Sequence, residues 1–215
     1  MKQSNYFQKK KVLIFDLDHT IISCDSLKYF LLKWFSKKPK IFFMNLLYLI
    51  FVYVLYNIRL VNREKLKEIF LIVAFKGSSK KEILKFSESF ARLLISKYLR
   101  VKTKKILNKK NCIKILVSAS PNFYVKIIGK ILKFDQVYST KIDLNKKIGK
   151  IIGKNCYGTQ KLLIIKKLKH NTKYLYFFTD SKSDVPLLNY CKKTFVIPKT
   201  ISDKFFLRKY KKLNW

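Results

Sequence analysis

The sequence has few cysteines and little that resembles a targeting segment. Its four cysteines, Cys24, Cys112, Cys156 and Cys191, are widely spaced, with no CxxC pair and no paired histidines near them. This spacing argues against a zinc site, and isolated reduced thiols fit a cytosolic compartment. The segment Met1–Lys10 is polar and basic and too poor in apolar residues for a secretory signal, so we expect no export.

Arginine is scarce in a strongly basic chain. The net charge is +36, from 48 Lys and Arg against 12 Asp and Glu, yet only five of the basic residues are Arg. A charge of this size suggests nucleic acid or an anionic membrane surface as a partner. Because base-reading and bidentate phosphate sites favour Arg, and the lysines are spread through every segment, a compositional bias explains the charge better than nucleic-acid binding does.

The length and hydrophobic content set bounds on the fold. With 215 residues, of which 49% are hydrophobic, the chain is not disordered and can bury a core without disulfides or a structural metal. One large domain, or one domain with an inserted cap, fits this length.

Acidic residues are few, and their placement is informative. Four of the eight Asp residues form two clusters, Asp16 with Asp18 and Asp180 with Asp184. The apolar run 12–15, typical of a strand buried on both faces, stops at Asp16. Residues two apart share one face of an extended chain, so both carboxylates can converge at the strand end, which suits a metal ion and a phosphoryl group. The alternative is an ordinary acidic turn.

Two later apolar strands also end in polar groups. Cys112–Val117 is followed by the sequence SASP at 118–121, where a hydroxyl and free N–H groups before a helix can bind phosphate oxygens, although Ser is also a common N-cap. Tyr174–Thr179 leads directly into Asp180. Asp184, four residues later, has the alternative role of N-cap for the next helix.

Almost every segment between the first two strands predicts a helix. The signals are an Asp N-cap, a capping box and apolar residues at helical spacing. The predicted helices are Asp25–Lys38, Asn62–Phe75, Ser79 to about Leu99, and Val101–Asn108. Residues 21–108 are therefore a helical insertion into an α/β unit formed by residues 1–20 and 109–215. That unit has further predicted strands at Gln136–Thr140 and, as the last, Phe195–Pro198, with a polar hairpin at Lys141–Lys154.

The insertion contains an uncharged apolar segment, Ile41–Ile58. As a helix it is about 27 Å long, the lower limit for a membrane span. Its flanks are basic: Lys37, Lys38, Lys40, Arg59, Arg63 and Lys65. If this segment crossed the membrane once, Asp16 and every later segment would lie on opposite sides and could not share one site. The segment must therefore re-enter on the same side or lie in the membrane interface, with Ile69–Phe75 as a second contact with the membrane. The alternative is a buried core helix of a cap.

Lys161 is marked only by its position. It follows Gly158 at the start of the predicted helix Leu162–Lys169, and a solvated surface lysine is the alternative reading.

Four ordered motifs carry a resemblance to a known family. They are DLDHT at Asp16–Thr20, Ser118 in VSAS, Lys161 after CYG, and DSKSDVPLL from Asp180. Over almost its whole length the chain resembles the haloacid dehalogenase superfamily of phosphohydrolases. The insertion is similar to the all-helical C1 cap of subfamily IB, which includes phosphoserine phosphatase-like members. The resemblance implies an α/β fold with a Rossmann-like, doubly wound parallel sheet.

The resemblance also implies a mechanism. Asp16 would attack phosphorus to form an aspartyl-phosphate, and Asp18 would act as general acid and then base. The implied phosphate-binding residues are Ser118, Ala119 and Lys161. The implied ligands of Mg²⁺ are Asp16, Asp18 through its backbone carbonyl, Asp180, and Asp184, which orients water on the ion. His19 stands where the family often has Gly, and we expect a local structural role for it.

The resemblance extends to a substrate. The segment 41–58 with its basic flanks, and the sequence CKKTFVIP at 191–198, are similar to the phosphatidylglycerophosphatase C group of the same subfamily. We therefore expect a phosphatase of a lipid phosphate such as phosphatidylglycerophosphate, bound to the anionic cytoplasmic face of the inner membrane. One alternative is a soluble cytoplasmic phosphatase of phosphoserine or another small metabolite. Another is a non-catalytic, basic nucleic-acid-binding protein.

Overall fold

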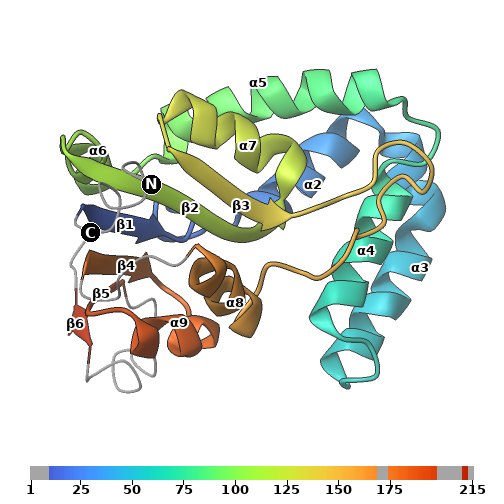
Figure 1. The fold of residues 1–215 in the computed structure, drawn as a ribbon. Coiled ribbons are helices and arrows are strands. Elements are labelled where there is room, and N and C mark those ends of the chain that lie inside the picture. Colours follow the sequence, from blue (N-terminus) through green and yellow to red (C-terminus); the bar gives the residue numbers. More distant parts are fainter. Residues whose placement is uncertain (1–9, 169–173, 198–209, 213–215) are drawn as a thin grey trace.

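The computed structural model describes residues 10–168, 174–197 and 210–212. The expectation for the N-terminal segment 1–9 lies outside these residues, as do Lys169 and Pro198, the predicted ends of two elements. Six parallel strands form one sheet in the order β3-β2-β1-β4-β5-β6 (Figure 1). The strands are β1 (Lys11–Phe15), β2 (Cys112–Pro121), β3 (Gln136–Thr140), β4 (Leu175–Thr179), β5 (Lys193–Val196) and β6 (Lys211–Lys212). This is the strand order of a doubly wound sheet, which confirms the predicted fold class.

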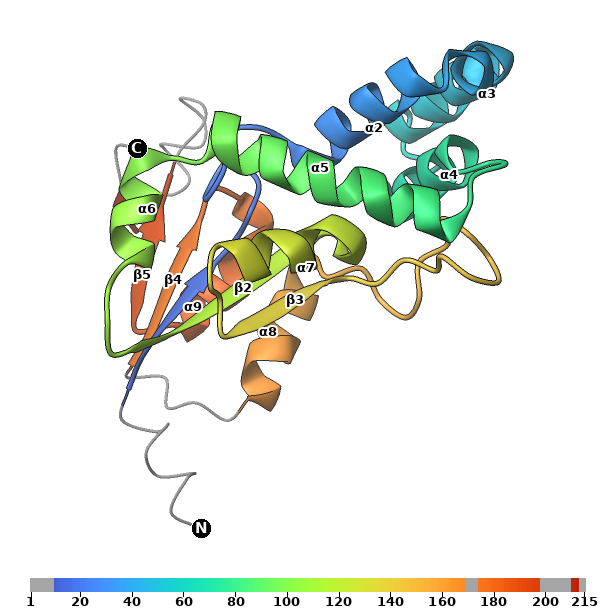
Figure 2. The same cartoon turned by 90° about the horizontal axis from the view of Figure 1, so that it is seen from above.

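Helices cover both faces of the sheet. The helices of the chain are α2 (Ser26–Lys37), α3 (Pro39–Asn57), α4 (Arg63–Ala74), α5 (Lys80–Tyr98), α6 (Val101–Leu107), α7 (Asn122–Ile131), α8 (Thr159–Lys167) and α9 (Val185–Tyr190). Helices α5 and α7 lie over one face, and α8 and α9 over the other (Figures 1 and 2). Helices α2 to α6 all fall between β1 and β2 in the sequence.

Strand β1 shows why its sequence is apolar without alternation. Leu13 and Phe15 belong to the core on the face of α5 and α7, whereas Val12 and Ile14 belong to the core on the face of α8 and α9. All four side chains are buried, because β1 lies inside the sheet and both of its faces are covered.

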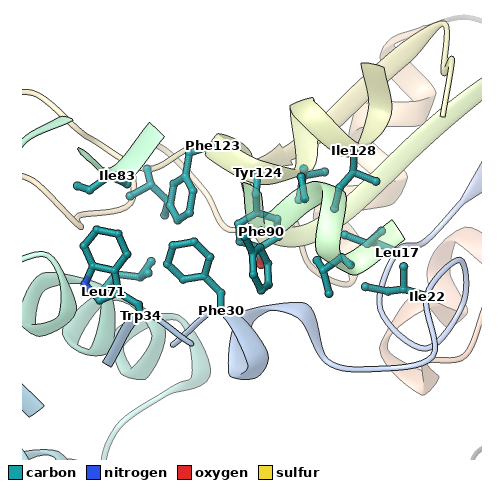
Figure 3. Packing of buried hydrophobic residues seen from close by; sticks show 14 of the residues in the cluster. Leu17, Ile22, Phe30, Trp34, Leu71, Ile83, Phe90, Phe123, Tyr124 and Ile128 are labelled. Carbon is teal, nitrogen blue, oxygen red and sulfur yellow. The ribbon is translucent and has the colours of Figure 1, made fainter. Parts of the chain in front are cut away.

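An aromatic cluster docks the inserted helices onto the core (Figure 3). The ring of Phe30 on α2 lies 5.0 Å from Phe90 on α5 and 5.5 Å from Tyr124 on α7, centroid to centroid. Trp34 packs beside them and donates its indole N–H to the carbonyl of Ala74 at 2.6 Å. Edge and stacked ring contacts of this kind add to the free energy of burial, so the cap and the sheet share one continuous core.

Local signals placed the helix starts correctly. The side chains of Asp25, Asn62 and Ser79 each accept a hydrogen bond from the backbone N–H three residues later. These bonds confirm the predicted N-terminal ends of α2, α4 and α5, because a capping side chain satisfies an amide that has no partner within the helix.

Other boundaries differ from the prediction. Strand β2 does not end at Val117 but continues to Pro121, and its pairing with β3 shifts between Ser118 and Pro121. The predicted last strand near Phe195 is β5, but it is not the last, because β6 follows it. By contrast, the predicted hairpin at 141–154 is present: Ile142 and Ile151 form an antiparallel bridge, and the backbone N–H groups of Asp143 and Ile152 donate to the carbonyls of Lys150 and Lys141. Bulges and short edge strands depend on tertiary partners, so the local sequence does not show them.

The apolar segment forms α3, which is largely exposed. Among the described residues α3 is the one helix long and apolar enough to cross a membrane, with a mean hydropathy of 1.7, and 11% of that window is buried. Only Leu49 and Val52 are fully buried, whereas Phe43 and Leu47 are 69% and 83% exposed. The interpretation as a buried core helix is therefore wrong.

Candidate active site

The two aspartate clusters meet at the edge where the strand order reverses. Strands β1 and β4 are parallel neighbours, and the backbone N–H of Asp16 donates to the carbonyl of Phe178 at 2.9 Å. Asp16 directly follows β1, and Asp180 directly follows β4. The chain winds outward from β1 through β2 and β3 and from β4 through β5 and β6, so this is the crevice where ligands bind in open α/β sheets.

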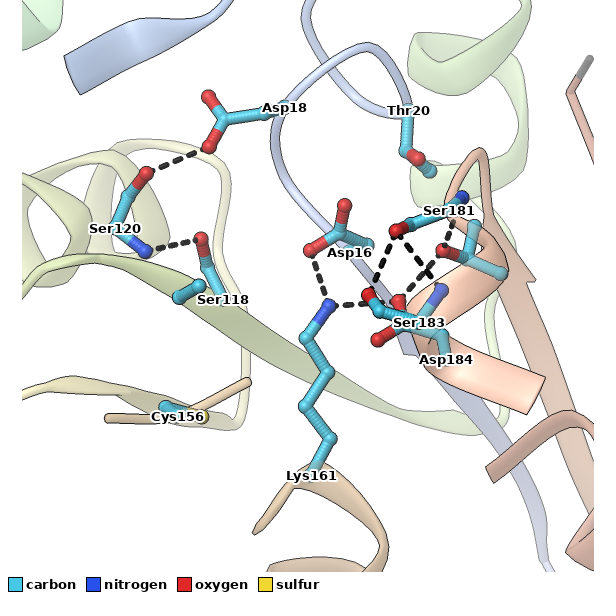
Figure 4. Close-up of polar contacts among 12 residues, drawn as sticks. Asp16, Asp18, Thr20, Ser118, Ser120, Cys156, Lys161, Ser181, Ser183 and Asp184 are labelled. Atoms are coloured by element: carbon cyan, nitrogen blue, oxygen red, sulfur yellow. Dashed lines mark hydrogen bonds and ion pairs between the residues drawn. The ribbon is translucent and has the colours of Figure 1, made fainter. Parts of the chain in front are cut away.

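Lys161 joins the two clusters. Its Nζ atom lies 2.6 Å from Oδ1 of Asp16 and 2.7 Å from Oδ2 of Asp184 (Figure 4). The side chain is 3% exposed, so the reading as a solvated surface lysine is wrong. Helix α8, which carries it, starts after Gly158, where φ is 54° and a Cβ atom would lie 3.3 Å from the carbonyl of Ser183. A glycine there lets the chain turn tightly beside the Asp184 segment.

Asp184 stands at the N-cap position of α9, but its side chain makes no capping hydrogen bond. It turns into the site instead, where Oδ2 accepts from Lys161 and from the Thr179 hydroxyl at 2.7 Å. Its other oxygen, Oδ1, is buried and has no hydrogen-bond partner among the described residues. The N-cap interpretation is therefore wrong, and Asp184 presents an unshared oxygen inside a polar site.

The charges of this site perturb one another. Burial raises the pKa of Asp16 well above its ordinary value; the negative charges of Asp184, Asp180 and Asp18 act in the same direction, and Lys161 opposes them. Burial by itself lowers the pKa of Lys161, but the charges of Asp16 and Asp184 outweigh it and raise that pKa. The lysine is therefore held as a cation against two carboxyls.

Asp18 is held separately, toward the cap. Its Oδ1 accepts from the backbone N–H of Ser26 at 2.7 Å, and its Oδ2 accepts from the hydroxyl of Ser120 at 2.6 Å. Burial and the charge of Asp25 raise the pKa of Asp18, while the bonds from the two serines oppose the rise. A carboxyl with a raised pKa and a fixed orientation is suited to carry a proton.

The remaining predicted residues lie around this centre. The hydroxyl of Ser118 accepts from the backbone N–H of Ser120 at 3.0 Å, and the carbonyl of Ala119 accepts from Lys67 at 2.7 Å. Oδ1 of Asp180 accepts from the hydroxyl of Thr20 at 3.3 Å. No group of three or more His, Cys, Asp and Glu side chains is arranged to hold a metal ion among the described residues. Between Asp16 and Asp184 the positive charge is the ammonium of Lys161.

Several contributing residues carried no functional prediction. They are Thr20, Ser26, Lys67, Ser120, Tyr124, Asn155 and Thr179. Ser120 belongs to the SASP motif that the sequence singles out, but its hydrogen bond to Asp18 could not be predicted from the motif. Lys67 lies one helical turn before the buried Leu71, and that spacing is the one local sign that it faces inward. His19 has φ 54°, a conformation that favours glycine, which fits the structural role expected of it.

The family model described as haloacid dehalogenase-like hydrolase matches residues 13–189, a span that contains every site residue described above. The chain belongs to this family. Membership confirms the predicted resemblance to the superfamily and makes the chain a hydrolase. Together with a buried carboxylate and lysine site at the carboxyl edge of the sheet, it supports a phosphatase.

Solved structures share the fold of this haloacid dehalogenase-like hydrolase. A protein of unknown function from Bordetella pertussis Tohama I has a TM-score of 0.79 at 19% identity, over 95% of this chain and 98% of the other. A phosphoserine phosphohydrolase-like protein from Francisella tularensis has a TM-score of 0.65 at 17% identity, over 94% of each chain. A phosphoserine phosphatase in its apo form has 0.61 at 14% identity, over 94% and 100%. No curated protein matches the sequence.

Proposed function

We propose that this chain is a Mg²⁺-dependent phosphomonoester hydrolase that works through an aspartyl-phosphate on Asp16, and that its substrate is a membrane lipid phosphate. The observation that carries the catalytic part is the contact of one buried lysine with Asp16 and Asp184 in a chain of this hydrolase family. Placement of an attacking carboxylate beside a fixed cation suits phosphoryl transfer, where positioning and charge stabilisation do most of the work.

Each step uses a residue of the site. A carboxylate oxygen of Asp16 attacks phosphorus and the bond from phosphorus to the substrate oxygen breaks, while Asp18 gives its proton to the leaving alcohol. Asp18 then takes a proton from water as the water oxygen attacks phosphorus and releases Asp16. The ammonium of Lys161 and the hydroxyl of Ser118 bind the phosphoryl oxygens, which lets an anionic substrate approach a cluster of carboxyls.

The donors at this edge fit Mg²⁺ in kind. They are oxygens that lie at or shortly after the ends of β1 and β4, and Oδ1 of Asp184 is buried without a hydrogen-bond partner in the part of the chain that the structure describes. The residues that would hold the ion are Asp16, the backbone carbonyl of Asp18, Asp180 and Asp184. When bound, Mg²⁺ supplies positive charge that offsets the phosphate and polarises it.

The proposal of a lipid substrate rests on α3. Asp16 precedes this helix and Lys161 follows it, yet the two are in contact, so both ends of α3 lie on the same side of any membrane. Helix α4 packs against α3 (Figure 1) and exposes Glu64 and Lys65 near its start, charges that do not belong in hydrocarbon. We infer that α3 lies in the plane of the interface with its exposed face, including Phe43 and Leu47, toward the acyl chains.

Charge supports the same placement. Lys37 and Lys38 lie just before α3, Lys40 lies in its first turn, and Arg59 and Arg63 follow it, with no acidic residue in the helix. Each such residue near an anionic leaflet contributes about 1 kcal/mol of binding free energy. Because the cytoplasmic leaflet of membranes is anionic, this charge favours the cytoplasmic face of the membrane as the location.

A second candidate is a soluble phosphatase of a small phosphorylated metabolite. It is supported by the similarity in fold to phosphoserine phosphatase and to a phosphoserine phosphohydrolase-like protein. This candidate predicts no advantage for a lipid substrate over phosphoserine.

One experiment separates these candidates. Phosphate release is measured from phosphatidylglycerophosphate in mixed micelles, from phosphoserine and from p-nitrophenyl phosphate, with and without Mg²⁺, for the wild type and Asp16→Asn. We expect Mg²⁺-dependent release that is fastest from the lipid, and none from Asp16→Asn when circular dichroism shows it to be folded. Preference for phosphoserine would favour the soluble candidate. Activity in Asp16→Asn would end the assignment of the nucleophile.

A further inference from the structure

A buried lysine of the cap reaches into the core beside the site. Lys67 lies in the middle of α4 and is 9% exposed. Its Nζ donates to the carbonyl of Ala119 at 2.7 Å and to Oδ1 of Asn155 at 2.8 Å, two residues that lie 52 and 88 positions away in the sequence. These bonds connect an inserted helix directly to the end of β2, just after Ser118.

The burial of Lys67 is costly, and no carboxylate bonded to it offsets the cost. Both of its acceptors are neutral. Burial lowers the pKa of Lys67 to about 8 and the positive charge of Arg63 one turn earlier acts in the same direction, while the charges of Asp18 and Glu64 oppose this without outweighing it. An apolar side chain of similar length would fill this place without the desolvation penalty of an amine. Packing alone therefore does not explain why a lysine with two hydrogen bonds stands here.

The acceptor of Lys67 is part of the site itself. The Ala119 carbonyl also accepts from the hydroxyl of Thr140 at 2.6 Å. The other end of the same peptide unit, the N–H of Ser120, donates to the hydroxyl of Ser118 at 3.0 Å. A donor on the carbonyl polarises the peptide and strengthens its N–H as a donor, so Lys67 both orients this peptide and fixes the Ser118 hydroxyl through it.

A second contact from the inserted helices reaches the same end of β2. The first residue of α2, Ser26, donates its backbone N–H to Asp18, and its hydroxyl lies 3.0 Å from the hydroxyl of Ser120. Ser120 in turn donates to Asp18 at 2.6 Å. Two inserted helices therefore contact the end of β2, and Ser120 at this end bonds both the candidate acid and the candidate phosphate-binding hydroxyl.

We propose that Lys67 is a positioning residue: from the cap, it fixes the Ala119–Ser120 peptide so that Ser118 and Asp18 take their working places when the cap is closed on the core. The inference rests on the proposed phosphatase activity and adds to it a route by which the position of the cap sets the rate. Lys67 acts through the peptide and does not touch the reacting phosphoryl group.

The test uses the full chain and p-nitrophenyl phosphate, with Lys67→Met, Lys67→Arg and a matched control, Lys85→Met, an exposed lysine of the cap helix α5. Small misplacement of reacting groups costs about 10²-fold in rate, so we expect Lys67→Met to lower kcat by about that factor with KM little changed. Lys67→Arg restores part of the rate because it keeps the donors, and Lys85→Met keeps the wild-type rate.

A readout independent of activity accompanies the kinetics. We expect hydrogen exchange in the segment 112–121 to be faster in Lys67→Met than in Lys85→Met, because the peptide has lost a partner. If Lys67→Met does not fold, the same measurements are made on Thr140→Val. This variant removes the other donor to the Ala119 carbonyl and should lower kcat in the same way.

Three results would overturn the proposal. They are a folded Lys67→Met with wild-type kcat, a change in KM alone, or unchanged exchange in the segment 112–121. The exchange measurement tests the role of Lys67 even if the wild type releases no phosphate. Absence of phosphate release from the wild type would refute the proposed function but would leave the exchange result to decide the role of Lys67.

Discussion

The Nζ atom of Lys161 lies 2.6 Å from Oδ1 of Asp16, although 145 residues separate the two in the sequence. The same nitrogen lies 2.7 Å from Asp184, and all three side chains are buried. One buried ammonium pairs with two buried carboxyls. Lys161 should therefore contribute to the stability of the fold as well as to the chemistry of the site.

Removing this ammonium should destabilise the fold. Lys161→Met leaves two buried carboxyls facing each other, and breaking a buried ion pair costs about 3–5 kcal/mol in the free energy of unfolding. Urea denaturation of the metal-free chain measures this, with Lys85→Met as a control that should change the free energy by less than about 0.5 kcal/mol. An unchanged urea midpoint for Lys161→Met would contradict the charge assignment.

The same pair predicts a pH dependence of stability. The pKa of Lys161 is raised in the folded chain, so its stabilising contribution is complete below its ordinary pKa of 10.5 and is lost as pH rises through the raised value. Removal of Lys161 also raises the pKa of Asp16 further, which destabilises the variant as pH rises, so we expect the difference in unfolding free energy between the wild type and Lys161→Met not to decrease from pH 7 to pH 9. A difference that disappears within this range would show that the lysine is not held as a cation.

Asp18 should matter most for poor leaving groups. As general acid it contributes about 10²–10⁴-fold in rate when the leaving alcohol needs a proton, and much less for p-nitrophenolate. We expect Asp18→Asn to slow release from glycerol phosphate far more than from p-nitrophenyl phosphate. Because the later step, in which Asp18 acts as base, is the same for both substrates, the losses are compared in kcat/KM, which reports on formation of the aspartyl-phosphate. Equal losses in kcat/KM would contradict the role of Asp18 as general acid.

The raised pKa of Asp18 adds a pH test. Burial and the charge of Asp25 keep its proton to a higher pH than in a free aspartate, so the rate with glycerol phosphate should fall as pH rises through that raised pKa. The fall should be absent in Asp18→Asn. A limb of the pH profile that survives in the variant would belong to another group.

The exposed face of α3 should govern binding to membranes. Phe43→Glu with Leu47→Glu places two charges where the proposed contact lies, and we expect flotation with vesicles that contain phosphatidylglycerol to be lost. Val101→Glu with Ile152→Glu adds the same charge at exposed apolar positions outside α3 and should leave flotation unchanged. Equal binding by the two double variants would show that the net charge, not α3, drives association.

The buried thiols should resist alkylation. Burial raises the pKa of Cys156 and of Cys191 to about 12, so almost no thiolate exists at pH 8. We expect iodoacetamide to leave both unmodified in the native chain and to modify them in urea, as measured by mass spectrometry of peptides. Fast native labelling of Cys156 would mean that the site opens more than the structure shows.

Local physics let the sequence determine much of the fold. The run 12–15 is apolar at every position because both faces of β1 are covered, and that pattern needs no knowledge of the partners. The helix starts at Asp25, Asn62 and Ser79 were readable because each cap bonds an amide only three residues away. The order of the motifs around Asp16, Ser118, Lys161 and Asp180 was also present in the sequence alone, and it was enough to indicate the family.

Only the tertiary structure decided where the side chains point. Asp184 looked equally like an N-cap, Lys161 like one surface lysine among many, and Lys67 carried no functional signal at all. Each of these roles depends on partners from 23 to 145 residues away, and no pattern within one helix or strand encodes such a contact. The exposure of α3 was undecided for the same reason, because an apolar helix has one sequence pattern whether a core or a membrane covers it.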